Sequence, residues 1–130
     1  TYSDLYSYLS ADAGLTALVA DRIYPSIIPQ GATYPCVRVT REDDGGFVDF
    51  DGQGGTIRTA VDTDCIAETL ADALAIAAAV RAALYGYTGL MGTRRVVRVS
   101  LEAEIDEYEP ELSGGKHRAS QAWTLWHYED

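Results

Sequence analysis

Few residues of this chain have the chemistry of an active site, and the two histidines are the first to consider. His117 and His127 lie ten residues apart in one extended run. An even separation places both side chains on one face of a strand, but a rise of ~3.3 Å per residue puts them roughly 33 Å apart. They cannot share a metal ion or a catalytic site within one chain. The sequence therefore predicts two edge or surface histidines.

Acidic residues at alternating positions offer a second kind of chemistry. Glu102 and Glu104 would share one strand face, as the two acids of a glycosidase do. The acidic run continues through Asp106, Glu107, Glu109 and Glu111. A run of this kind is typical of a solvated face. The sequence therefore predicts no catalytic residue and no enzyme.

The glycine- and aspartate-rich segment 43–55 resembles half of a calcium loop. Asp49, Asp51 and Gln53 place oxygen donors at alternate positions before a glycine. The twelfth position, which needs a bidentate Glu, is Ala60, and no helix flanks the segment. The glycines lead into a strand, so the helix N-terminus that cradles phosphate is missing as well. We expect no metal and no cofactor.

Both phenylalanines of the chain, Phe47 and Phe50, lie in this segment beside Val48. The composition predicts a long flexible loop, in which water would meet them. Either the loop folds back and buries them locally, or they wait for a partner, because exposed aromatic side chains commonly mark contact sites.

Two short helices are expected to open the chain. Residues 3–9 form the first, with Leu5 and Leu9 one turn apart on the same side. Residues 12–19 form the second, with Asp12 as its N-cap.

Residues 67–85 are predicted to form one long helix, with Gly86 as the C′ residue that follows it. Its buried face would carry Leu70, Ala73, Leu74, Ala77, Val80 and Leu84. Its many alanines leave a smooth surface that could pack closely on a sheet.

Alternating apolar and polar residues predict the strands. They are residues 36–42, 56–66, 94–106 and 116–128, with Ile23 and Tyr24 as an edge piece. In the third of these, Val97, Val99, Leu101, Ala103 and Ile105 face one way and charged residues face the other. Such alternation indicates one packed face and one wet face. The fold class is α+β, a mostly antiparallel β-sheet packed by one long α-helix, with short N-terminal helices.

The composition suits one compact domain spanning residues 1–130, because 47% of the residues are hydrophobic. No apolar run approaches the ~18 residues that a membrane span needs. Cys36 and Cys65 could form one disulfide, but two buried free thiols fit a protein made in a reducing cytoplasm better.

The formal net charge of −10 argues against nucleic-acid binding, because basic residues and counterion release drive such binding. The charge could simply keep a small protein soluble.

The segment 21–35 is irregular and yet apolar. Pro25, Pro29 and Pro35 each fix φ and remove a backbone donor, so neither a helix nor a central strand can run through it. The same segment holds three isoleucines and Tyr24. It must therefore lie against a core or a partner.

This segment and others resemble a known family. The residues concerned are Arg22-Ile23-Tyr24-Pro25, Ile28-Pro29-Gln30-Gly31-Ala32 and Pro35-Cys36-Val37. They look like the tail completion (tail terminator) family of long-tailed bacteriophages and gene transfer agents. Residues 9–19, 64–67, 80–84 and 108–110 are similar to the family's opening helices, strand-to-helix junction, long-helix end and acidic turn. Ile66 and Cys36 depart from the pattern, standing where members often carry an aromatic residue.

The resemblance implies a structural ring subunit. Family members form a homo-hexameric ring on the head-proximal end of the tail, stop polymerisation of the tail tube, and join the tail to the head connector. The implied partners are further copies of the chain, the tail tube protein and the head connector or stopper protein. DNA would pass through the lumen without specific binding, and if the acidic residues line that lumen they would repel phosphate and let the duplex slide. No membrane is involved. Assembly in the host cytoplasm would place the protein in the virion tail or neck.

Ring and docking contacts need surface residues, and the sequence offers ten candidates. They are Arg22, Tyr24, Gln30, Phe47, Val48, Phe50, Arg94, Arg98, Glu102 and Glu104. Arginines 22, 38, 94, 95 and 98 could pair across subunits with Asp62, Asp64, Glu102 and Glu104. Two other readings remain open, another neck or minor tail protein and a small ligand-binding α+β domain. A monomer with a deep polar pocket would favour the last.

Overall fold

A computed structural model of the chain describes residues 2–29, 31, 33–48, 56–91, 94–110 and 115–128. In chain order the elements are α1 (Tyr2–Ser10), α2 (Ala13–Val19), β1 (Ile23–Pro25), β2 (Cys36–Val48), β3 (Thr56–Ala67), α3 (Leu70–Leu84), β4 (Gly89–Met91), β5 (Arg94–Glu109) and β6 (Lys116–Tyr128). The fold is mixed α+β, as the sequence predicts.

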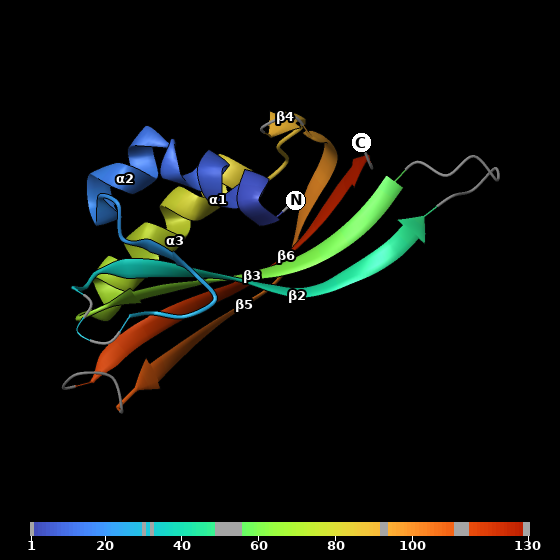
Figure 1. The fold of residues 1–130 in the computed structure, drawn as a ribbon. Coiled ribbons are helices and arrows are strands. Elements are labelled where there is room, and N and C mark those ends of the chain that lie inside the picture. Colours follow the sequence, from blue (N-terminus) through green and yellow to red (C-terminus); the bar gives the residue numbers. More distant parts are fainter. Residues whose placement is uncertain are drawn as a thin grey trace.

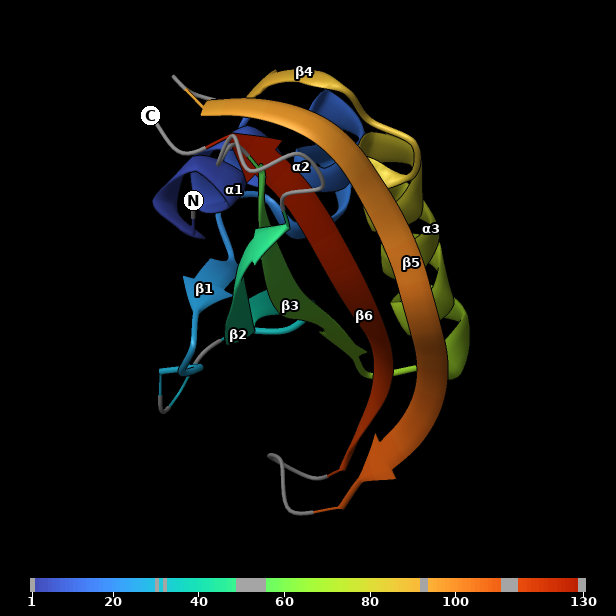
Figure 2. The same ribbon diagram turned by 90° about the vertical axis from the view of Figure 1, so that its right-hand side faces the viewer.

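The strands form one six-stranded sheet in the order β1-β2-β3-β6-β5-β4. β1 runs parallel to β2, and every other neighbouring pair is antiparallel. The sheet is twisted and curled, and α1, α2 and α3 lie together on one of its faces, here called the helix side (Figure 1, Figure 2). None of the described helices covers the opposite face, here called the open face.

The helix side holds the core. Leu5 and Leu9 of α1 are buried, as their spacing predicts. Asp12 is the predicted N-cap of α2, and its carboxylate accepts a hydrogen bond from the backbone N–H of Leu15 at 2.9 Å. Trp123 of the central strand β6 is buried beneath the helices. Three helices therefore cover this face together, and the prediction of a sheet packed by one long helix was wrong.

α3 is also shorter and differently oriented than predicted. It runs Leu70–Leu84 after its N-cap Thr69, because residue 67 still belongs to β3. At the other end, Gly86 takes the predicted C′ position with a φ of 73°. The buried residues are Ala73, Ile76, Ala77, Val80 and Leu84. Leu70 and Leu74, which were predicted to be buried, are 41% and 42% exposed.

The first part of the segment 43–55, predicted to be a flexible loop, belongs to a strand. β2 continues to Val48 and pairs with β3 along that length. The register shifts at two places between Arg41 and Phe47. The second shift falls at two adjacent glycines, Gly45 and Gly46, which lie inside the strand. A bulge accommodates such extra residues without ending the pairing. The rest of the segment, including Phe50, lies outside the described residues.

β5 departs from the strict alternation predicted for residues 94–106. Its register with β6 shifts twice, and Val97 and Glu102 are the extra residues. Each extra residue exchanges the faces of the residues that follow it. Ile105, which was predicted to be packed, consequently faces away from the helices and is 58% exposed. Its neighbour Glu104, which was predicted to be on the wet face, lies on the helix side.

The histidines do not occupy the edge or surface positions predicted for them. They belong to β6, which lies between β3 and β5 and is not an edge strand. His127 is 1% exposed, and its Nε2 lies 2.8 Å from the hydroxyl of Thr59. His117 is half-buried beside the ring of Tyr108, with 5.1 Å between ring centroids.

Candidate protein interaction surface

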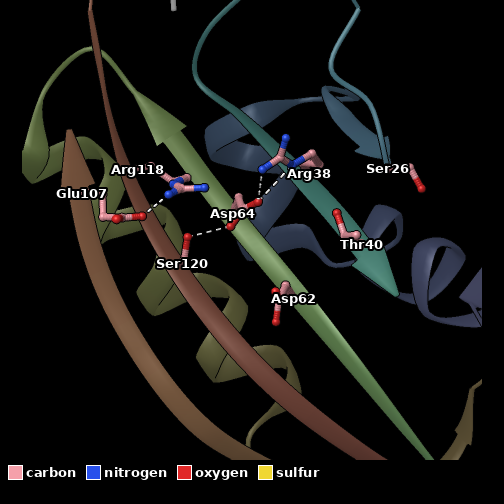
Figure 3. Close-up of a pocket in the computed structure, with 8 residues that line it drawn as sticks. All are labelled: Ser26, Arg38, Thr40, Asp62, Asp64, Glu107, Arg118 and Ser120. Carbon is pink, nitrogen blue, oxygen red and sulfur yellow. Dashed lines mark hydrogen bonds and ion pairs between the residues drawn. The ribbon is translucent and has the colours of Figure 1, made fainter. Parts of the chain in front are cut away.

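The centre of the open face carries charged side chains from three neighbouring strands. Residues paired in register point to the same face, so Arg38, Asp64 and Ser120 form one row across β2, β3 and β6. Arg38 donates to the carboxylate of Asp64 from Nε at 2.9 Å and from a terminal nitrogen at 2.5 Å. The hydroxyl of Ser120 donates to the same carboxylate at 2.6 Å. Beside this row, Arg118 forms an ion pair with Glu107 of β5 (Figure 3).

These side chains line an open depression of about 490 Å³. Its other lining residues are Ser26, Thr40 and Asp62. Every lining residue is polar or charged, which suits contact with another polar protein surface better than an apolar ligand. The alternation of Asp62 and Asp64 with apolar and threonine residues along β3 was the sequence signal for this face. It did not reveal that five segments of the chain converge there.

The chemistry of the depression is that of a fixed charge array. The Asp64 side chain is only 7% exposed and already accepts three hydrogen bonds. It therefore ties three strands together, and no histidine or cysteine lies in the lining to activate the Ser120 hydroxyl. The arrangement presents charges without placing a nucleophile beside a base.

Three of the residues predicted to pair across subunits, Arg38, Asp64 and Glu104, have ion-pair partners within the chain. Arg38 and Asp64 form an ion pair with each other at 2.5 Å. Glu104 pairs with Arg81 of α3, also at 2.5 Å. In-register pairing in the sheet brings the first pair together, and the register shift in β5 brings Glu104 to the helix side.

The predicted interface residues lie in separate places. Arg22 donates from Nε to the carbonyl oxygen of Pro35 at 2.8 Å and so fastens the proline-rich segment. Tyr24 is half-buried in the edge strand β1. Arg98 and Glu102 are exposed on β5, toward the other edge of the sheet.

Other predicted interface residues are only partly described. Phe47 and Val48 end β2, and Arg94 begins β5, but the structure describes only the backbone at these three positions. Gln30 and Phe50 fall outside the described residues altogether. The described members of the set thus form no single surface.

A polar network beneath the helices was not anticipated. The hydroxyl of Thr63 accepts a hydrogen bond from Nε1 of Trp123 at 3.0 Å and donates to Oε1 of Gln121 at 3.1 Å. Gln121 in turn donates to the carbonyl oxygen of Ala77 in α3 at 3.0 Å and to Glu104 at 3.3 Å. This network links β3, β6 and β5 to α3, and is typical of a satisfied buried polar cluster that fixes one packing arrangement.

Local hydrogen bonds also set the protonation of two glutamates on β5. The hydrogen bond from Arg81 holds the pKa of Glu104 below its usual value, with help from Gln121. Hydrogen bonds from Ser100 and Thr124, together with the guanidinium groups of two arginines, lower the pKa of Glu102. Both carboxylates are therefore charged at neutral pH.

The described part of the chain contains neither a metal-binding cluster nor a membrane-spanning helix. Its His, Cys, Asp and Glu side chains include no group of three or more that could hold a metal ion. Its helices include none long and apolar enough to cross a membrane.

Comparison with known families identifies the chain. The family described as tail completion protein gp17 matches residues 3–126, nearly the full length. The chain belongs to this family. Membership makes it a structural tail protein of the phage type, with its place in the tail of a virion. The resemblance that the proline-rich segment suggested is thereby confirmed.

The fold of this tail completion protein is similar to that of a solved structure. The match is to a chain in a structure described as the virion of a native gene transfer agent particle. The TM-score is 0.76 at 23% sequence identity, with 98% of this chain and 94% of that chain covered. At this identity the likeness shows a shared fold. No curated protein matches the chain.

Proposed function

We propose that the protein is a ring subunit that caps the head-proximal end of a phage-type tail tube. The cap ends polymerisation of the tube and joins the tail to the head connector. Family membership over residues 3–126 is the observation that carries this proposal. The assembled unit is a homo-hexamer whose lumen lets DNA pass without specific binding, and its function comes from interfaces, not from catalysis.

The shape of the sheet supports a role between two partners. β2 and β3 extend beyond the helices at one end, and β5 and β6 extend at the opposite end (Figure 1). A cap must match the tube protein on one side and the connector on the other. Two strand pairs that project in opposite directions can reach both partners at once. The Phe47 and Val48 end of β2 remains a candidate docking site on one of these arms.

The acidic composition fits the same role. Net charge −10 keeps DNA from binding the chain tightly. The polar open face supplies charges that can meet a partner's surface and set the register of docking.

Particles produced without the protein test this proposal. We expect overlong tails that are not joined to heads, visible by negative-stain electron microscopy, because nothing caps the growing tube. Wild-type protein supplied from a plasmid should restore both tail length and attachment. Tails of normal length on filled heads would contradict the proposal. Tails of normal length that fail to join heads would indicate another neck component instead.

A further inference from the structure

One end of the open face carries a row of two arginines on either side of a tryptophan. Arg58 of β3 and Arg98 of β5 are each paired in register with Trp126 of β6. Partners in register point to the same face, so the three side chains form one row across the sheet, here called the basic row. β6 lies between the other two strands, which places the indole between the two guanidinium-bearing side chains.

The polar groups of the basic row have few interaction partners among the described residues of the chain. Arg58 and Arg98 are exposed, and neither forms an ion pair among the described residues. Glu102 lies close enough for their charge to lower its pKa, and its carboxylate offsets one of the row's two positive charges. The indole N–H of Trp126 is buried, and in the described part of the chain it has no acceptor. A buried donor without an acceptor is unfavourable, and a partner's carboxylate or carbonyl oxygen would supply the missing acceptor.

The opposite end of β5 has the opposite charge. Asp106, Glu107 and Tyr108 are all exposed there, and are here called the acidic arm. Glu107 pairs with Arg118, whereas Asp106 forms no ion pair among the residues that the structure describes. Arg98 and Asp106 are eight residues apart on one strand, which corresponds to about 25 Å. The acidic arm therefore cannot reach the basic row of its own chain.

We propose that the acidic arm of one copy docks on the basic row of the next copy. This inference rests on the proposed ring function and names the surfaces that would close the ring. The two surfaces differ and lie at opposite ends of the sheet, so the contact is head-to-tail, which is the type that a ring requires. By register Arg98 points to the open face and Asp106 to the helix side, so the two complementary charges lie on opposite faces as well as at opposite ends, and both side chains are exposed. A nucleic acid is a poorer occupant, because the chain carries twenty acidic residues against ten basic ones.

Cross-linking tests the contact directly. Arg98→Cys and Asp106→Cys are introduced together, and purified particles or concentrated protein are treated with a short bismaleimide. The native thiols are buried, and the two new ones are too far apart within a chain to be bridged. We expect a ladder of covalent oligomers on denaturing gels. The matched control, Arg98→Cys with Asp72→Cys on the outer side of α3, should remain monomeric. A monomer band alone from the first variant would overturn the inference.

Charge exchange supplies a second test that does not depend on cysteine geometry. Arg98→Glu should weaken self-association at least about tenfold in sedimentation or native mass spectrometry, because like charges then meet. Adding Asp106→Lys should restore association, whereas Asp72→Lys, which restores the same net charge elsewhere, should not. Equal behaviour of the two double variants would refute the contact.

The outcomes separate this inference from the proposed function. If the cross-linked ladder is absent while particles without the protein have overlong tails, the capping role stands and the ring closes through another surface. If the ladder forms while those tails are normal, the contact stands and the capping role fails. If Arg58→Glu leaves self-association unchanged but lowers the affinity for labelled duplex DNA, the basic row binds nucleic acid and the inference is wrong.

Discussion

Glu104 of β5 accepts a hydrogen bond from Arg81 of α3 at 2.5 Å, across the layer between sheet and helix. The contact exists because the register of β5 shifts at Glu102, which moves the next residues to the other face. Without that shift Glu104 would face away from the helices with the acidic residues around it. One extra residue in a strand thus moves a charge from the open face to the helix side, where it links two layers at the surface.

This link makes stability depend on pH in acid solution. The folded pKa of Glu104 lies below its usual value of 4.5, so the carboxylate stabilises the fold above that value. The contribution is lost as pH falls through the lower, folded pKa, because the unfolded state then binds the proton more readily. Glu104→Gln should flatten the fall in unfolding free energy below about pH 4.5, measured by denaturant titration at several pH values. Arg81→Gln should flatten it similarly, and an unchanged pH profile in both variants would contradict the role of this pair.

The orientation of α3 can be tested with two neighbouring substitutions. Ile76 is 1% exposed, whereas Leu74 is 42% exposed. Ile76→Ala should lower the free energy of unfolding by about 2–5 kcal/mol, because it opens a cavity in the core. Leu74→Ala should lower it by less than about 1 kcal/mol, as surface changes do. Urea denaturation measures both losses. A larger loss for Leu74→Ala than for Ile76→Ala would mean that α3 is rotated relative to the orientation described.

The buried network predicts a cost for removing one hydroxyl. Thr63→Val keeps the shape of the side chain but leaves the N–H of Trp123 and Oε1 of Gln121 without their partner. Each unsatisfied buried group costs about 1–3 kcal/mol. Thr63→Ser keeps the hydroxyl and should lose only about 1 kcal/mol for the methyl group. If thermal unfolding gives equal losses for the two variants, the hydroxyl does not stabilise the fold.

The two cysteines should be unreactive in the folded protein. Cys36 and Cys65 are both fully buried, and burial raises the pKa of Cys36 to about 11 and that of Cys65 still further. Cys36 pairs in register with Ile66, the neighbour of Cys65 in β3. Because adjacent residues of a strand point to opposite faces, the two thiols lie on opposite faces of the sheet and cannot form a disulfide. Ellman's reagent at pH 8 should react slowly with native protein and rapidly with two thiols after unfolding. Rapid reaction of the native protein would contradict the burial, and fewer than two thiols after unfolding would indicate a disulfide.

The sequence predicted the elements better than it predicted their faces. The capping side chain of Asp12 and the C′ position of Gly86 follow from local geometry, so both were predicted correctly. α3 is apolar on nearly every side, so spacing alone could not choose between Leu74 and Ile76. Glycines in residues 43–48 suggested a loop, because the pairing that holds them in β2 comes from the next strand, β3, and local composition does not show it.

The candidate surface was harder to predict for the same reason. Alternation marked Asp62, Asp64 and Arg38 as polar positions of strands. Only the register shows that Arg38 and Asp64 neutralise each other, and that Arg58, Trp126 and Arg98 share a row. Register depends on turns, bulges and long-range packing, which the local pattern does not encode.

The position of the protein in its particle is the most direct test of its proposed capping role. A peptide tag at the C-terminus, detected with gold-labelled antibody on purified particles, would locate each copy by electron microscopy. We expect a single cluster of label at the junction of head and tail, on every intact particle. Label along the tail tube, at the distal tip or on the capsid shell would contradict it.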